Sequence, residues 1–155
     1  MMNLLQTNLS IFSYNKSFEW NRLQFLCGQM QTNVKGLWFY AEFESFRVDS
    51  EANFYALHVD GYNGNSGDSL SNITSDVWQI QTGMHFSTYD VDNDMSNAVP
   101  ACAVLYNGGF WFNNCGYSCL TCMNGTKHFS WWSLQDYGLQ TQGRLRAARM
   151  MIRSI

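Results

Sequence analysis

Three aspartates stand at alternate positions between Asp90 and Asp94, the densest group of carboxylates in the chain. Carboxylates this close together converge only around a cation, and hard oxygen ligands of this kind suit calcium. The stretch is not an EF-hand loop, because the sixth and twelfth positions from Asp90 hold Met95 and Ala101 instead of glycine and glutamate. A surface turn is the alternative, since Asp and Asn both favour turns. Acid–base catalysis is less favoured, because no apolar pocket nearby would separate the carboxyl pKa values.

Cysteines offer a second kind of chemistry, and their odd number leaves at least one without a partner in the chain. The five are Cys27, Cys102, Cys115, Cys119 and Cys122. For the Cys-x-x-Cys pair of Cys119 and Cys122, a redox motif would need a preceding strand and a following helix, and a zinc site would need a second ligand pair. A local disulfide or two unreacted thiols is therefore the favoured interpretation of this pair. A buried free thiol is the favoured interpretation of Cys27.

The compartment has to be inferred indirectly, since the first residues show neither the basic region nor the long apolar region of a signal peptide. Four Asn-x-Ser/Thr sequons together favour an oxidising, glycosylating compartment. They begin at Asn8, Asn15, Asn72 and Asn124. No apolar run approaches the roughly 18 residues that would cross a membrane.

Composition predicts one compact domain with few charges. Of the 155 residues, 46% are hydrophobic and 14% are charged, which is well below the usual quarter. The net charge of −3 and the lack of a basic patch argue against a nucleic-acid partner. The one cationic cluster alternates with apolar residues and predicts the solvated face of a terminal strand or helix. It consists of Arg144, Arg146, Arg149 and Arg153.

Hydrophobic alternation predicts two strands upstream of the acidic stretch, from Phe39 to Val48 and from Tyr55 to Val59. Their short connection predicts antiparallel pairing. A long turn-rich loop is expected from Gly61 to Asp68, and a short helix from Trp20 to Met30. The chain after residue 61 reads mostly as loop, which needs disulfides or metal ions to offset the entropy of ordering it.

Five ordered blocks then stand out. They are Glu51-x-x-x-Tyr55-x-Leu57-x-Val59-x-Gly61-Tyr62-x-Gly64-x-x-Gly67-Asp68-Ser69-Leu70; Gly83-Met84-x-Phe86-Ser87-Thr88-Tyr89-Asp90-x-Asp92-Asn93-Asp94; Cys102-Ala103 with Gly108-Gly109-Phe110-Trp111-Phe112-Asn113-Asn114-Cys115; Met123-Asn124-Gly125; and Arg144-Leu145-Arg146-x-x-x-Met150-Met151-Ile152-Arg153. In this order the blocks resemble the fibrinogen-related domain. The likeness covers the chain from about Gly36 to Arg153.

The resemblance implies an α+β fold, with a twisted antiparallel sheet, short helices and a loop-rich calcium- and ligand-binding subdomain. Residues 37–155 are then a partial fibrinogen-like C-terminal domain. Residues 1–36 do not resemble the family and are expected to form a divergent N-terminal segment. The family's own N-terminal subdomain is missing from this sequence.

The resemblance also implies a calcium ion and a disulfide. The side chains of Asp92 and Asp94 would bind the ion, followed by the backbone carbonyls of Ser96 and Ala98. The segment from Asp94 to Cys102 departs from the family pattern, because it is about two residues longer and contains Pro100. The family disulfide maps onto Cys102 and Cys115, whose separation of thirteen matches the family. A cis peptide is expected before the second cysteine, between Asn114 and Cys115.

A ligand pocket beside this disulfide is the last implication. In many family lectins it binds acetyl groups, and in fibrinogen it binds a peptide amine. Tyr106 falls on one aromatic position of the pocket, while Gly116 replaces the usual histidine. His128 and Phe129 are expected in the downstream wall, near the pair Trp131-Trp132, which reads as core more often than as a carbohydrate platform.

The resemblance therefore implies a secreted, calcium-binding recognition module without enzymatic activity. The leading hypothesis is lectin-like binding of acetylated or other glycans in innate defence or cell-surface recognition. The alternative is a protein–protein interaction or structural module that has lost sugar binding, and a hydrolase using the acidic stretch comes third. The ligand would be a glycan or a protein. A homo-oligomer is left open.

Overall fold

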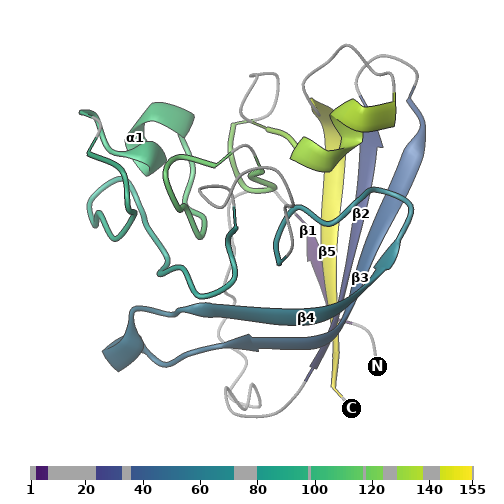
Figure 1. The fold of residues 1–155 in the computed structure, drawn as a ribbon, viewed down its shortest axis with the longest axis horizontal. Helices are drawn as coiled ribbons and strands as arrows, with labels where there is room; N and C mark the ends of the chain where they lie inside the picture. The colour runs from purple at the N-terminus through teal and green to yellow at the C-terminus, as the bar shows by residue number, and fades with distance from the viewer. Residues whose placement is uncertain are drawn as a thin grey trace.

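A computed structural model describes residues 3–6, 24–32, 36–71, 80–97, 99–116, 118–123, 129–137 and 144–154. One five-stranded antiparallel sheet with strand order β1-β5-β2-β3-β4 runs through them (Figure 1). Its strands are β1 (Asn3–Gln6), β2 (Gln24–Thr32), β3 (Trp38–Val48), β4 (Leu57–Gly64) and β5 (Leu145–Ser154). The helical elements are short: η1 (Glu51–Asn53), α1 (Cys102–Tyr106) and η3 (Trp132–Tyr137).

The predicted hairpin is confirmed as β3 and β4, which pair antiparallel with Phe43 opposite Tyr62 and Ala41 opposite Gly64. The prediction of a loop from Gly61 onward is wrong for its first residues, because β4 continues to Gly64. Glycine permits this continuation: a Cβ at Gly64 would lie 2.4 Å from the Tyr40 carbonyl oxygen. The close approach of the two backbones therefore requires glycine at this position.

The short helix expected from Trp20 to Met30 is wrong, since β2 occupies Gln24–Thr32. β2 lies between β3 and β5 and pairs with both. Leu26 and Met30 lie in the core, while Cys27 is also buried at 6% exposure. With apolar residues on both faces, β2 lacks the clean alternation of a half-buried strand, and its pairing with two neighbours overrides local propensity.

The closing stretch of arginines forms β5, so the strand is correct among the two alternatives, strand or helix, that the sequence pattern left open. It pairs with β1 on one side and with β2 on the other. Arg146 and Arg153 lie toward solvent, whereas Leu145 and Met151 are buried. The predicted solvated face therefore holds for Arg146 and Arg153, whereas Arg149 is half-buried and lies over the Trp38 ring, 5.4 Å from its centroid.

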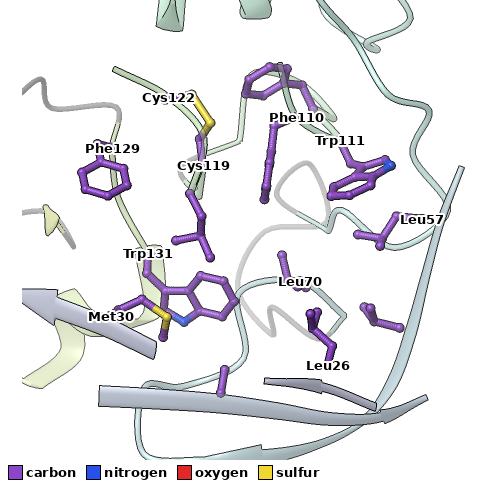
Figure 2. Close-up of a cluster of buried hydrophobic side chains, with 14 of the residues drawn as sticks. Leu26, Met30, Leu57, Leu70, Phe110, Trp111, Cys119, Cys122, Phe129 and Trp131 are labelled. Atoms are coloured by element: carbon purple, nitrogen blue, oxygen red, sulfur yellow. A yellow bond between two sulfur atoms is a disulfide. The ribbon is translucent and has the colours of Figure 1, made fainter. Parts of the chain in front are cut away.

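The loop-rich part of the protein packs on the sheet and shares one core with it (Figure 2). Trp131 is 1% exposed and donates from its indole N–H to the carbonyl of Gly67 at 2.9 Å. Trp111 donates in the same way to the carbonyl of Tyr55 at 2.7 Å. Each buried indole N–H thus has an acceptor, which its burial requires. None of the helices among the described residues is long and apolar enough to span a membrane.

Candidate functional site

The acidic loop from Asp90 to Asp94 is anchored on the core by its neighbour Ser87. The backbones of Ser87 and Phe110 exchange two hydrogen bonds, of 3.0 and 3.2 Å. The Ser87 hydroxyl also accepts the backbone N–H of Asn93 at 3.0 Å, and the Asn93 amide donates to the Phe86 carbonyl at 2.8 Å. Since Ser87 and Phe110 are both buried, the loop is held at one end by rigid packing.

Asp94 connects the acidic loop to helix α1. One carboxylate oxygen accepts the backbone N–H of Ser96 at 2.8 Å, and the other accepts that of Cys102 at 2.9 Å. Asp92 lies beside it and accepts the backbone N–H of Asp94 at 3.2 Å. Burial raises the pKa of the Asp94 carboxyl; the two backbone N–H groups lower it, and the nearby Asp92 carboxylate raises it again. The two carboxylates therefore face each other at a cost that a cation would relieve.

Among the described residues, no three side chains of His, Cys, Asp or Glu converge on one point. Any cation held by Asp92 and Asp94 would therefore complete its coordination with backbone carbonyls or water molecules. Of the two carbonyls expected from the resemblance, Ser96 follows Asp94 in the same loop. Ala98 lies outside the described residues.

The expected disulfide between Cys102 and Cys115 is present, with Cα atoms 5.0 Å apart. It ties the start of α1 to the segment that follows Phe112. The expected cis peptide between Asn114 and Cys115 is wrong, because this bond is trans and the backbone turns through a positive φ of 53° at Cys115. A cis peptide occurs instead at Val99–Pro100, in the segment that departs from the family pattern.

A second disulfide joins Cys119 and Cys122, which is one of the two alternatives left open by the sequence. Both cysteines are buried, and the loop between them lies against Gly108. A Cβ at Gly108 would come within 2.7 Å of the Cys122 Cα. Thr121 donates its hydroxyl hydrogen to the Gly109 carbonyl, so the small loop is fixed against the segment after α1.

Cys27 is a buried free thiol, as predicted. Burial raises the pKa of this thiol, and the neighbouring Glu42 on β3 raises it further. The thiolate is therefore disfavoured, and Cys27 acts as a small core residue.

The described residues of the expected ligand pocket lie in the interior. Tyr106 is 8% exposed and stacks edge-on against Phe112, with ring centroids 5.6 Å apart. Phe129 is 3% exposed, and Gly116 is buried as well. His128 lies outside the described residues. The pocket assignment for these residues stays a prediction.

Sequence reasoning missed a group of exposed apolar side chains near the acidic loop. We call it the exposed apolar patch; it comprises Tyr89, Val91, Met95, Val99, Val104 and Leu105. These are six of the eleven large apolar side chains exposed among the described residues. A signal did exist, since apolar residues without helical or strand periodicity recur in a loop rich in Asn, Ser and Asp.

Comparison with known proteins gives a family match over most of the sequence. The model for the fibrinogen beta and gamma chains, C-terminal globular domain, matches residues 25–153. The match begins upstream of residue 37, where the sequence analysis set the start of the domain, and it includes nearly all of β2.

Several curated proteins are similar to shorter stretches. Tenascin from Gallus gallus is 36% identical over 107 residues, 65% of this chain. Angiopoietin-4 from Bos taurus is 41% identical over 79 residues, 51% of this chain. Fibrinogen-like protein 1 from Bos taurus is 43% identical over 79 residues, 49% of this chain. The matched stretches span only 5%, 14% and 25% of the lengths of these three relatives.

Solved structures agree with the fold. The fibrinogen-like globe domain of human ANGPTL6 matches with a TM-score of 0.69 and 26% identity, over 87% of this chain and 58% of that one. The corresponding domain of human ANGPTL2 matches with a TM-score of 0.67 and 27% identity, over 86% of this chain and 59% of that one. In both cases the match spans a little over half of the compared domain structure.

Proposed function

Because this protein belongs to the family of the C-terminal globular domain of the fibrinogen beta and gamma chains, we propose that it is an extracellular recognition module. In this proposal it binds calcium on the acidic loop, recognises a protein ligand and catalyses no reaction. Two disulfides in 155 residues support an oxidising compartment, where such bonds persist.

The observation that carries the calcium proposal is the arrangement of Asp92 and Asp94. Two carboxylates of like charge lie together, and no Lys or Arg occurs within thirty residues of them in the sequence. A hard divalent cation would offset this charge with oxygen ligands. The two aspartates would supply side-chain oxygens, and Ser96 and Ala98 would supply carbonyls. The bound ion would then stabilise the loop and, through Asp94, the start of α1.

A protein ligand fits the surface better than an acetylated sugar does. Gly116 provides neither the ring donor nor the wall of the histidine that usually occupies its position. Tyr106 and Phe129 are turned into the core, so little of either ring is left for stacking on a sugar. A buried acetyl carbonyl that lost its donor would forfeit about 1–3 kcal/mol. Because a single lectin site binds its sugar weakly, such a loss would remove most of the binding.

Thermal melting with calcium or with a chelator tests the first part of the proposal. Calcium should raise the melting temperature of the parent protein, because a ligand that binds the native state stabilises it by mass action. The variants Asp92→Ala and Asp94→Ala should lose this rise. An identical melt in calcium and in chelator for the parent protein would contradict the calcium site.

A glycan array tests the second part. We expect weak or no binding of N-acetylated sugars by the parent protein, and stronger binding after Gly116→His. Lectin-like recognition would replace the protein-ligand proposal if the parent bound N-acetylglucosamine tightly, if Gly116→His changed nothing, and if Tyr106→Ala weakened that binding.

A further inference from the structure

Charge is divided unevenly along the sequence. Residues 48–126 carry eight carboxylates and no Lys or Arg, whereas the remainder holds all nine Lys and Arg and only four carboxylates. In space, the arginine-bearing strand β5 lies well away from α1 (Figure 1). Among the described residues, the loop-rich side therefore carries carboxylates and no Lys or Arg, a charge distribution that attracts partners of opposite charge.

The exposed apolar patch lies on this same negative side. Its most exposed members are Val99 at 97%, Tyr89 at 80% and Met95 at 62%. Large apolar side chains gathered on the surface of a folded domain mark interaction sites more often than chance. The patch and the carboxylates of Asp90 and Asp92 are interleaved along one loop.

The fold holds the two parts of the patch together. The Asp94 carboxylate accepts the backbone N–H of Cys102, so the acidic loop is joined to α1. On α1, Cys102 and Tyr106 are buried, while Val104 and Leu105 are exposed at 41% and 44%. The helix thus turns one face to the core and adds its other face to the surface beside the loop.

We propose that the exposed apolar patch, with Asp90 and Asp92, docks a segment of another protein that carries Lys or Arg next to apolar side chains. Apolar contacts would supply most of the affinity, and the carboxylates would speed encounter and reject acidic partners. This inference rests on the proposed function and deepens it by naming the surface and the chemistry of the partner.

Calcium does not remove the charge complementarity. One bound ion would offset the charges of Asp92 and Asp94 and would leave the carboxylate of Asp90 on the same loop. Asp90 is not among the expected calcium ligands, and its carboxylate accepts a hydrogen bond only from the Thr88 hydroxyl among the contacts described, at 2.7 Å. Asp90 therefore stays available to a basic side chain while the calcium site is filled.

A second copy of the protein is the competing occupant, because β5 supplies its own arginines. The same sheet is less suited to the negative side, since Glu44 is exposed on β3 and Glu42 is half-buried on the same strand. Self-association would therefore bring carboxylates against carboxylates as well as against arginines. A separate basic partner avoids this repulsion.

The test measures binding of a synthetic peptide of alternating Lys and Leu by fluorescence anisotropy, in calcium and at several salt concentrations. Matched peptides of alternating Lys and Ser, and of alternating Glu and Leu, serve as controls. The parent protein should bind the first peptide and neither control. Tyr89→Ser and Val99→Ser should each weaken binding by about three- to tenfold, since both remove apolar contact area. Asp90→Asn should weaken it about threefold and reduce its salt dependence.

The control variant is Leu37→Ser, which removes an apolar side chain that is 48% exposed but lies outside the patch. It should bind the Lys-Leu peptide as the parent does. The inference is overturned if the parent does not bind this peptide, if the Glu-Leu peptide binds equally well, or if Tyr89→Ser and Val99→Ser leave binding unchanged. It is also overturned if sedimentation shows that the parent self-associates and that Val99→Ser abolishes this association.

The calcium melt separates this inference from the proposed function. All patch variants should keep the calcium-induced rise in melting temperature, because they leave Asp92 and Asp94 intact. A calcium rise without peptide binding overturns the docking surface alone. Peptide binding without a calcium rise overturns the calcium site and leaves the docking surface standing.

Discussion

At the residue scale, Asp92 and Asp94 should destabilise the folded protein when no cation is bound and stabilise it when one is bound. Burial and then the neighbouring Asp92 raise the pKa of Asp94, although two backbone N–H groups oppose this. The folded protein therefore binds a proton at Asp94 more readily than the unfolded one. Protonation of Asp94 therefore stabilises the folded protein at low pH. This stabilisation is lost as the pH rises from 3.8, the ordinary pKa of the group, through its raised pKa in the folded protein. At neutral pH the destabilisation by the charged Asp94 carboxylate is fully present.

We predict that Asp92→Asn changes stability in opposite directions under the two conditions. In chelator it should raise the melting temperature by about 1–3 °C, because it removes a like charge and keeps the oxygen that accepts the Asp94 N–H. In calcium it should lower the melting temperature, because it removes a ligand. Thermal melts at neutral pH measure both effects. Glu51→Gln, at an exposed carboxylate distant in sequence, is the control and should show no such reversal.

Gly108 shows how one residue fixes the position of the second disulfide. A Cβ there would meet the Cys122 Cα and the Thr121 carbonyl oxygen, each at 2.7 Å. Both contacts are with backbone, which cannot move aside as a flexible side chain does. The absence of a side chain at this position is therefore a condition for the packing of the Cys119–Cys122 loop.

Gly108→Ala should accordingly destabilise the protein by about 1–3 kcal/mol, as overpacking of a well-packed interior does. Guanidinium unfolding curves provide the measurement. The matched control is Gly28→Ala on β2, where the new Cβ would lie no closer than 3.5 Å to another atom. Equal midpoints for the two variants would contradict this packing argument.

At the element scale, the sequence predicted β3 and β4, which bury one face against the core, but did not predict the central strand β2. β3 and β4 alternate apolar and polar residues, so periodicity identifies them. In β5 the arginines are three and four residues apart, which left this stretch open between strand and helix. β2 has neighbours on both sides and buried residues on both faces. Its pairing depends on partners distant in sequence, which local patterns do not contain.

The site was predictable to a similar degree. Residue type and spacing indicated the acidic loop, and the resemblance to the family implied the Cys102–Cys115 pairing. The burial of Tyr106 and Phe129 and the exposure of Val99 depend instead on which loops cover which residues. This is a property of the folded protein that residue spacing does not determine.

The two disulfides should differ in their contributions to stability. In the chain-entropy model, closing a loop of thirteen residues contributes about 3 kcal/mol, whereas closing one of three or four contributes about 2 kcal/mol. We therefore predict that the double variant of Cys102→Ala with Cys115→Ala loses more stability than that of Cys119→Ala with Cys122→Ala. Guanidinium midpoints compare the two. The reverse order would show that the buried packing of the smaller loop outweighs chain entropy.

At the scale of the whole molecule, sheet and loops share one core. The cluster of buried residues includes Leu26 and Met30 from the sheet, and Phe110 and Trp131 from the loop-rich part (Figure 2). Neither part retains a complete core without the other. A domain with one contiguous core is expected to unfold as a single unit.

Unfolding followed by two probes tests this expectation. Far-UV circular dichroism reports mainly on the sheet, whereas tryptophan fluorescence reports on buried indoles such as Trp111 and Trp131 in the loop-rich part. We predict coincident transitions for the two signals in guanidinium. Calcium should shift both to higher denaturant by the same amount, because an ion bound at the acidic loop stabilises every element that unfolds with it. Asp92→Ala should abolish both shifts together. If calcium moved the fluorescence transition and left the dichroism transition in place, the loop-rich part would be a separate folding unit. The surface proposed for a partner would then be stabilised independently of the sheet.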